Sequence, residues 1–516
     1  MNVSRAKMKI RLLPNLSASV VSFAITLLVG FWYTPFLVRS LGVETYGTIM
    51  VIILIVSYLG VFVSSIVNTV NRSLTIAVEE SDTQKASSIF NTAFFLSLAV
   101  IAVLTIPSVV FSFEVDLFIV SESEASSLSS FVALMFIAFF VGFLADIFAC
   151  LQFSKNRIDS ISGSRIVELV VRVVSVVALF FLLGAKLVYV GVALVVAATG
   201  RLLYNLIGWK RLLPALSLSR QNFSFAELRS MTEISQWVLV TQISTILLNG
   251  IDMVVVNRIC SPRDAGIYAV VLAIVLLIRN GVASVVTVFM PKVYSLIAEE
   301  NYDALSVYVN QCCRLLGLAL VLPVGFLCGT SEEFMFLWLG ERYENISVLV
   351  AILLSPLVVN LAAMPLFSVS LGMNYVRIPA LVNLSFGIAN LLLALVLGVL
   401  LELGMFGVAV AAGVTLTTKN ILFTPVYAAR NINAHWSSFL GFVPLVIVAL
   451  LYVAMLSHWL AGLVVPDDWG EIVLAGVGVS LAYIPFLFWI GLDKPEQKFL
   501  LSSALRLREK TFNRKD

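Results

Sequence analysis

The sequence predicts an all-α, polytopic membrane protein with fourteen transmembrane helices. Of its 516 residues, 60% are apolar and only 12% are charged, whereas a soluble domain has roughly 45–50% apolar and 25% charged residues. The apolar residues gather in runs of about 20, which is long enough for a helix to cross roughly 30 Å of hydrocarbon. This pattern excludes a soluble enzyme, a disordered chain and an outer-membrane barrel, whose strands would be about 10 residues of alternating polarity.

Fourteen apolar segments follow one another along the chain. The first comes after a basic stretch, but it is too long for the apolar region of a signal peptide and no small-residue cleavage site follows it. We therefore expect a retained first span. The predicted spans are 16–38, 46–69, 89–112, 128–150, 166–184, 187–209, 235–257, 266–289, 307–329, 346–370, 379–400, 405–428, 438–461 and 471–491.

The lysines and arginines are distributed unevenly between the two sides of these spans. Segments on the side of the two termini hold 23 of the 33, the loops on the opposite side hold 5, and the remaining five lie inside spans. Cytoplasmic loops of membrane proteins carry the excess of Lys and Arg. We therefore predict that both termini are cytoplasmic.

Two halves of the chain repeat each other. The residues after span 1 align with those after span 7 at an offset of 219, which places Arg39 on Arg258 and Gly47 on Gly266. A second match, at an offset of 216, aligns the starts of spans 6 and 12. Two six-span lobes that enter the membrane in the same orientation form a parallel repeat, which can rock about a central cleft.

The repeat predicts the domain organisation. We expect an N-terminal six-span lobe, a cytoplasmic connector, a C-terminal six-span lobe, two extra spans and a basic cytoplasmic tail. Their limits are 1–209, 210–232, 233–428, 429–493 and 494–516.

Charged residues inside the spans are the strongest indication of function, because a lipid-facing charge costs several kcal/mol and persists mostly in a cavity or a pair. Five cations and three acids lie in these positions, so the intramembrane region is net positive. The arginine guanidinium matches phosphate geometry, which favours an anionic substrate in a basic cleft. The predicted substrate-binding residues are Arg279, Arg172, Arg201, Arg314 and Lys419, and the acids are Asp146, Glu168 and Asp252.

These charges have other interpretations. Glu168 and Arg172 are four residues apart on one helix and could neutralise each other. Arg201, Arg314 and Lys419 could extend to the cytoplasmic headgroups, whereas Arg279 is too deep to do so. Asp252 could bind a proton or sodium ion for coupling, or pair with a polar group of the neighbouring lobe.

Other ligand classes find little support. The net charge is only +3, so no nucleic-acid partner is expected. The five cysteines have no CxxC pair and the two histidines are too few for a Cys/His metal cluster, so we expect no metal and no cofactor.

Three segments carry a family resemblance. They are Leu41-Gly42-Val43-Glu44-Thr45-Tyr46-Gly47, Leu371-Gly372-Met373-Asn374-Tyr375-Val376-Arg377-Ile378-Pro379 and Gly404-Met405-Phe406-Gly407-Val408-Ala409. In this order and spacing the chain, over about 15–430, resembles the polysaccharide transporter family. These are the O-antigen and capsule-type flippases of the multidrug/oligosaccharidyl-lipid/polysaccharide exporter superfamily.

The resemblance implies two six-span lobes, a location in a bacterial cytoplasmic (inner) membrane and a function. The family moves an undecaprenyl-diphosphate-linked oligosaccharide from the inner to the outer leaflet, so lipid-linked oligosaccharide and membrane lipids are the implied partners, together with polysaccharide polymerase and ligase proteins. Related peptidoglycan-lipid flippases have fourteen spans, of which the last two form a groove. Of the arginines that those relatives carry in spans 1, 2 and 8, only Arg279 has a counterpart here, which argues against peptidoglycan lipid as the cargo.

The sequence therefore predicts a flippase, not an enzyme, which works by alternating access of two lobes around a cationic cleft. Arg279 would hold the diphosphate with help from the other four cations. Two alternatives stay open: an ion-coupled multidrug exporter of the same superfamily, and a membrane glycan polymerase or ligase. The second would need an ordered outer loop to grip sugars, and the outer-side loops are all short.

Overall fold

The computed structural model describes residues 21, 25–115, 125–214, 216–229, 243–340, 343, 345–373, 375, 377–464, 468–494 and 497. Within these ranges all regular secondary structure is helical, which confirms the predicted all-α class. Twelve helices in the described ranges are long and apolar enough to span a membrane, and a shorter apolar helix covers Ile25–Leu41. The start of predicted span 1, part of span 7 and most of the tail 494–516 lie outside the described residues. The count of fourteen spans stays a prediction.

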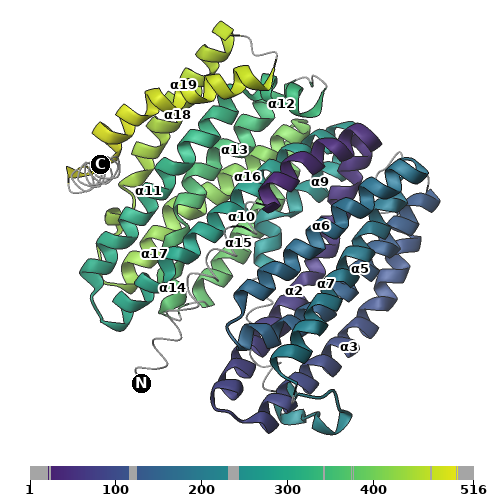
Figure 1. Cartoon of the computed structure of the whole chain (residues 1–516). Helices are drawn as coiled ribbons and strands as arrows, with labels where there is room; N and C mark the ends of the chain where they lie inside the picture. Colours follow the sequence, from purple (N-terminus) through teal and green to yellow (C-terminus); the bar gives the residue numbers. More distant parts are fainter. Residues whose placement is uncertain are drawn as a thin grey trace, which may run out of the picture. The chain divides into compact units, whose positions relative to one another are not determined.

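The chain divides into two compact units (Figure 1). The first unit comprises Met1–Ser284 with Val376–Thr415, and the second comprises Val285–Tyr375 with Leu416–Asp516. Two of the three limits between them fall inside helices, α10 (Pro262–Ala298) and α16 (Gly404–Thr418), and the third follows Tyr375, which lies outside any helix. The two six-span lobes and their connector remain a prediction.

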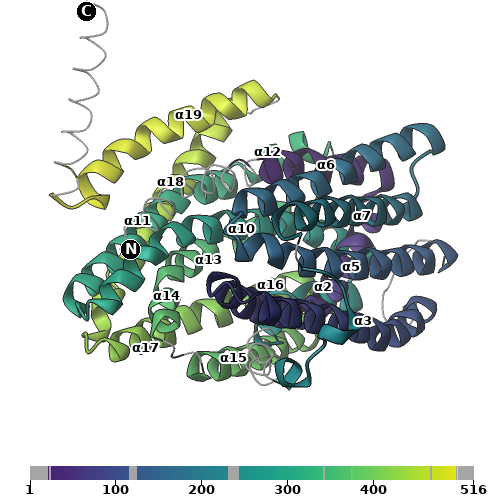
Figure 2. The ribbon, with the colours of Figure 1, turned by 60° about the horizontal axis from the view of Figure 1, so that its bottom comes forward.

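In the first unit, α5 packs against α2, α3 and α7, and α6 packs against α7 (Figures 1 and 2). The rings of Phe90, Phe148 and Trp209 meet at 5.3–6.1 Å between centroids in the core of this bundle. The helices are Ile25–Leu41, α2 (Val43–Glu79), α3 (Thr83–Phe113), α5 (Ala125–Ser154), α6 (Ile158–Leu183), α7 (Leu187–Leu212), α9 (Ile251–Ile259) and α15 (Arg377–Leu395).

Local sequence explains where several of these helices begin and end. Gly42, with φ of 87°, turns the chain between Ile25–Leu41 and α2 in a conformation that side chains rarely adopt. The Asp82 side chain accepts a hydrogen bond of 2.9 Å from the Lys85 backbone N–H and so caps α3. Gly184, with φ of 83°, ends α6.

Two glycines that the sequence repeat aligns face each other in the first unit. A Cβ added at Gly47, on α2, would lie 2.7 Å from the Cα and N atoms of Gly266 on α10. Real Cβ atoms essentially never approach backbone this closely, so the two helices cross here main chain against main chain.

Part of the predicted connector, 210–232, is described and packs on α3. The Asn91 amide donates to the Ser217 carbonyl (3.0 Å), and the Asn91 carbonyl oxygen accepts from the Ser219 N–H (2.8 Å). The connector therefore runs along α3, with a short 3₁₀ turn at Arg220–Asn222.

In the second unit, α11 packs against α13 and α18, and α18 packs against α19 (Figure 1). A Cβ at Gly325 would lie 2.8 Å from Val453 Cγ1, so the absence of a side chain lets α11 approach α18 closely. The helices are α11 (Tyr302–Gly329), α12 (Ser331–Leu339), α13 (Ile346–Ala362), α14 (Met364–Gly372), α17 (Thr424–Asn431), α18 (Phe442–Val464) and α19 (Trp469–Phe486).

Several details differ from regular spans. Predicted span 10 (346–370) is two helices that break at Ala363, because Pro365 at the start of α14 has no N–H to donate. Short π-helical segments extend α15, α16 and α19 at Val396–Leu400, Lys419–Phe423 and Leu487–Gly491. The helix α12 was not predicted.

Candidate functional site

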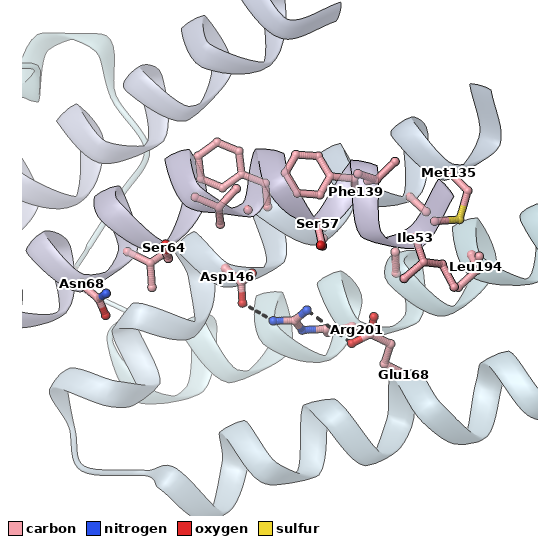
Figure 3. A pocket seen from close by; sticks show the side chains of 18 residues that line it. Ile53, Ser57, Ser64, Asn68, Met135, Phe139, Asp146, Glu168, Leu194 and Arg201 are labelled. Carbon is pink, nitrogen blue, oxygen red and sulfur yellow. Dashed lines mark hydrogen bonds and ion pairs between the residues drawn. The ribbon is translucent and has the colours of Figure 1, made fainter. Parts of the chain in front are cut away.

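Side chains from α2, α5, α6 and α7 line a cavity of about 490 Å³ in the first unit. Figure 3 shows Ile53, Met135 and Leu194 together at one end of this cavity, and Ser64 and Asn68 at the other. The cavity therefore has an apolar end and a polar end.

An ion-paired triad lies between these two ends (Figure 3). Arg201, on α7, pairs through Nη2 with Asp146 Oδ1 on α5, and through Nη1 with Glu168 Oε2 on α6 at 3.3 Å. The side chains of Arg201, Asp146 and Glu168 remain 15%, 31% and 34% exposed, so the acids keep part of their surface toward open space. With every group ionised, the triad carries a net charge of −1.

The triad changes the interpretation of two predicted residues. Glu168 pairs with Arg201 on another helix rather than with Arg172 on its own helix, so the geometry does not favour the local i,i+4 pair. The Arg172 guanidinium instead lies over the Tyr33 ring, 5.5 Å from its centroid. Aromatic faces attract cations at this distance.

Arg279 lies in a second polar cluster of the first unit. Its Nη1 donates a hydrogen bond of 2.6 Å to the amide oxygen of Asn249, which is a neutral partner. Nearby in the sequence, buried Asp252 accepts a bond of 2.9 Å at Oδ2 from the Tyr268 hydroxyl. Its Oδ1 is also buried and has no hydrogen-bond partner among the described residues.

The other two predicted cations lie in the second unit. Arg314 Nη1 pairs with Asp493 Oδ2 at 2.6 Å, and the Asp493 side chain is 60% exposed. Buried Lys419, at the start of the π-helical segment that extends α16, lies over Phe367 with Nζ 4.7 Å from the ring centroid. Among the predicted cations, Arg201 and Arg314 thus have carboxylate partners. Arg279 has a neutral hydrogen-bond partner, and Asp252 is close enough to act on its charge.

Sequence reasoning did not single out four residues that contact these charged side chains. All four lie inside or beside apolar runs: Tyr33, Asn249, Tyr268 and Phe367. Tyr and Asn inside a predicted span are a usable signal, because their polar atoms need a partner where water is excluded. Phe367 carries no such signal, since Phe is common in any apolar helix.

The geometry is accompanied by clear similarity to known proteins. Residues 12–296, more than half of the chain, match the family model described as polysaccharide biosynthesis protein. The chain belongs to this family. The family resemblance predicted from the sequence is thus confirmed.

Relatives of known sequence and structure agree with this assignment. The uncharacterized membrane protein EpsK of Bacillus subtilis (strain 168) is 28% identical over 488 residues, which are 94% of this chain and 97% of the relative. An inward-facing multidrug resistance MATE transporter of the MOP superfamily has a TM-score of 0.69 at 12% identity, covering 82% of this chain and 98% of that one. The lipid II flippase MurJ, in an inward closed conformation, has a TM-score of 0.61 at 15% identity and covers 91% and 98%. The polysaccharide biosynthesis family member described here therefore has the fold of MOP-superfamily transporters.

Proposed function

We propose that this protein is a flippase that moves a polyprenyl-diphosphate-linked oligosaccharide from the cytoplasmic to the outer leaflet for surface polysaccharide assembly. Membership of the polysaccharide biosynthesis family and a fold shared with a lipid II flippase support this function. The observation that carries it is the presence of ionisable side chains inside apolar helices. Asp146, Glu168 and Arg201 line the cavity of about 490 Å³, and Arg279 lies apart from it on α10. Such residues within membrane helices mark substrate or ion pathways.

Arg279 is the proposed contact for the diphosphate. Its hydrogen-bond partner, Asn249, is neutral, and Asp252, the acid that acts on its charge, is hydrogen-bonded to the Tyr268 hydroxyl instead, so the Arg279 guanidinium can still bind an anion. Arg201 and Arg314 already pair with carboxylates, which lowers their attraction for phosphate. Arg172 and Lys419, each over an aromatic ring, complete the proposed set of binding cations.

Replacing Arg279 with alanine tests this function. In a strain that depends on this gene, Arg279→Ala should abolish surface polysaccharide and cause the lipid-linked precursor to accumulate on the cytoplasmic side. The matched control is Arg263→Ala, because Arg263 lies on the same helix, is exposed and is not among the proposed binding residues. Immunoblotting of membranes should give equal protein for both variants. Normal polysaccharide on the surface of the Arg279→Ala strain would refute the assigned role.

The proposed mechanism is alternating access of two six-span lobes in the inner membrane, with both termini in the cytoplasm. No covalent step is needed, and the polymerase and ligase that act on the delivered glycan are the proposed protein partners. We place ion coupling at Asp252, whose buried Oδ1 accepts no hydrogen bond from the described residues. Transport into vesicles by Asp252→Asn protein should then lose its response to an imposed proton or sodium gradient.

An ion-coupled multidrug exporter is the second candidate. The TM-score of 0.69 with a multidrug resistance transporter favours it, together with the buried acid at Asp252. Expression in a drug-sensitive strain separates the two. Raised drug tolerance with unchanged surface glycans would support export of drugs, and restored glycans with unchanged tolerance would support the flippase.

A further inference from the structure

We infer that the cavity among α2, α5, α6 and α7 is the subsite for the sugar rings of the transported lipid and does not hold its diphosphate. This inference rests on the proposed flippase function and adds a place for the glycan.

Charge is the first argument. The guanidinium of Arg201 already pairs with both Asp146 and Glu168, and Arg165 is a second cation that acts on Asp146, so two arginines and two acids balance one another here. A diphosphate entering the cavity would have to displace one of these carboxylates and would then lie against it. A neutral polyhydroxyl group meets no such repulsion.

Hydrogen-bonding capacity is the second argument. Arg201 engages one oxygen of each carboxylate, and both acid side chains keep about a third of their surface exposed. An ionised carboxylate has about four lone-pair sites and accepts from several donors at once. Ser64 and Asn68 add hydroxyl and amide groups at the polar end of the cavity, on the Asp146 side of the triad (Figure 3). Sugar hydroxyls, which both donate and accept, match this mixture.

The volume of the cavity points to a ligand larger than an ion. About 490 Å³ falls within the roughly 300–1,000 Å³ of typical small-molecule sites. The opposite end is apolar, with Ile53, Met135 and Leu194, and Phe139 also lines the wall. A sugar ring has an apolar face of C–H groups as well as hydroxyls, so an amphiphilic cavity suits it better than it suits a hydrated cation.

Two glycines keep this space open. Gly60 on α2 and Gly142 on α5 both line the cavity, and a Cβ built at either one would meet no atom within 4 Å. Glycine disfavours helix relative to alanine, and here no neighbouring helix requires it. Both positions therefore leave space beside the helix backbone that a sugar ring can occupy.

Binding of two lipids to the purified full-length protein in nanodiscs tests the inference. One probe is the polyprenyl-diphosphate glycolipid fraction extracted from the native cell envelope, and the other is pure undecaprenyl diphosphate, which has no sugar. The variants are Glu168→Gln, which changes the charge of the triad, and Gly142→Leu, which fills the cavity and leaves every charge in place. The control is Asp159→Asn on the same helix as Glu168, because Asp159 pairs with Arg157 and is not among the residues that line the cavity.

We expect Glu168→Gln and Gly142→Leu each to weaken binding of the glycolipid fraction by about tenfold or more, and to leave binding of undecaprenyl diphosphate unchanged. Asp159→Asn should change neither. Equal weakening for both lipids, or no effect of Gly142→Leu on either, would overturn the sugar subsite while the flippase function stands. Failure of the wild-type protein to bind either lipid would instead overturn the flippase function itself.

Discussion

Valine at position 47 should destabilise the protein, although valine is a better helix former than glycine. Its Cβ would lie 2.7 Å from the Cα and N atoms of Gly266 and 3.1 Å from the carbonyl carbon of Ala265. All of these are main-chain atoms, so no side chain can rotate away and the helices must move apart. Overpacking of this kind costs about 1–3 kcal/mol, and the better helix propensity returns only about 0.3–0.5 kcal/mol. We therefore expect a net loss of about 0.5–2.7 kcal/mol.

The same substitution at Gly142 is the matched control. A Cβ there meets no atom within 4 Å, so Gly142→Val should gain the propensity term of about 0.3–0.5 kcal/mol at no steric cost. Thermal unfolding in detergent, followed by the fluorescence of the 8 tryptophans, measures both variants. The midpoint should fall for Gly47→Val and hold or rise for Gly142→Val. An unchanged midpoint for Gly47→Val, or shifts of the same sign and size, would refute the argument from main-chain contact.

Three further substitutions test the ionic contacts by the same unfolding measurement. Arg201→Leu leaves two carboxylates without their shared partner. It should lower the free energy of unfolding by an amount toward the lower end of about 3–5 kcal/mol, because both acids keep some exposure. A loss no larger than that of a typical surface substitution would count against the triad. Arg314→Ala should cost less than about 1 kcal/mol, since its partner Asp493 is 60% exposed, and a large loss would show that this pair is more buried than its geometry indicates. Tyr268→Phe removes the hydrogen bond to buried Asp252 and should cost about 1–3 kcal/mol, and wild-type stability would mean that another group satisfies this carboxylate.

The helices were the most predictable part of the structure. An apolar run of about 20 residues in a bilayer forms an α-helix, because every backbone N–H and C=O group must be hydrogen-bonded within the segment. The described residues of the predicted spans are therefore almost all helical, with breaks at Gly250 in span 7 and Ala363 in span 10. Departures from regular helix were less predictable. Proline lies inside α3 and α11 without ending either helix, yet Pro365 lies at the start of a new helix. The presence of proline alone therefore does not predict where a helix breaks.

The charged residues were predictable as a set, but their partners were not. An embedded charge is conspicuous in sequence, and all the predicted cations lie in helices in the described part of the chain. Pairing depends on which helices pack together. Spacing along one helix suggested Arg172 as the partner of Glu168, whereas Arg201 reaches Glu168 from α7. Asp493 lies beyond the last predicted span, so sequence had no reason to join it to Arg314.

The crossing of α2 and α10 at Gly47 and Gly266 has a mechanical consequence. Where bulky side chains interlock, turning one helix against the other breaks many van der Waals contacts, because packed cores are bistable rather than continuously deformable. At this crossing the main chain of α10 lies against the main chain of α2, with the Val43 side chain also beside Gly266. Contact between main chains fixes the distance between the two helices there, so we expect any relative movement of α2 and α10 to be a rotation about this point.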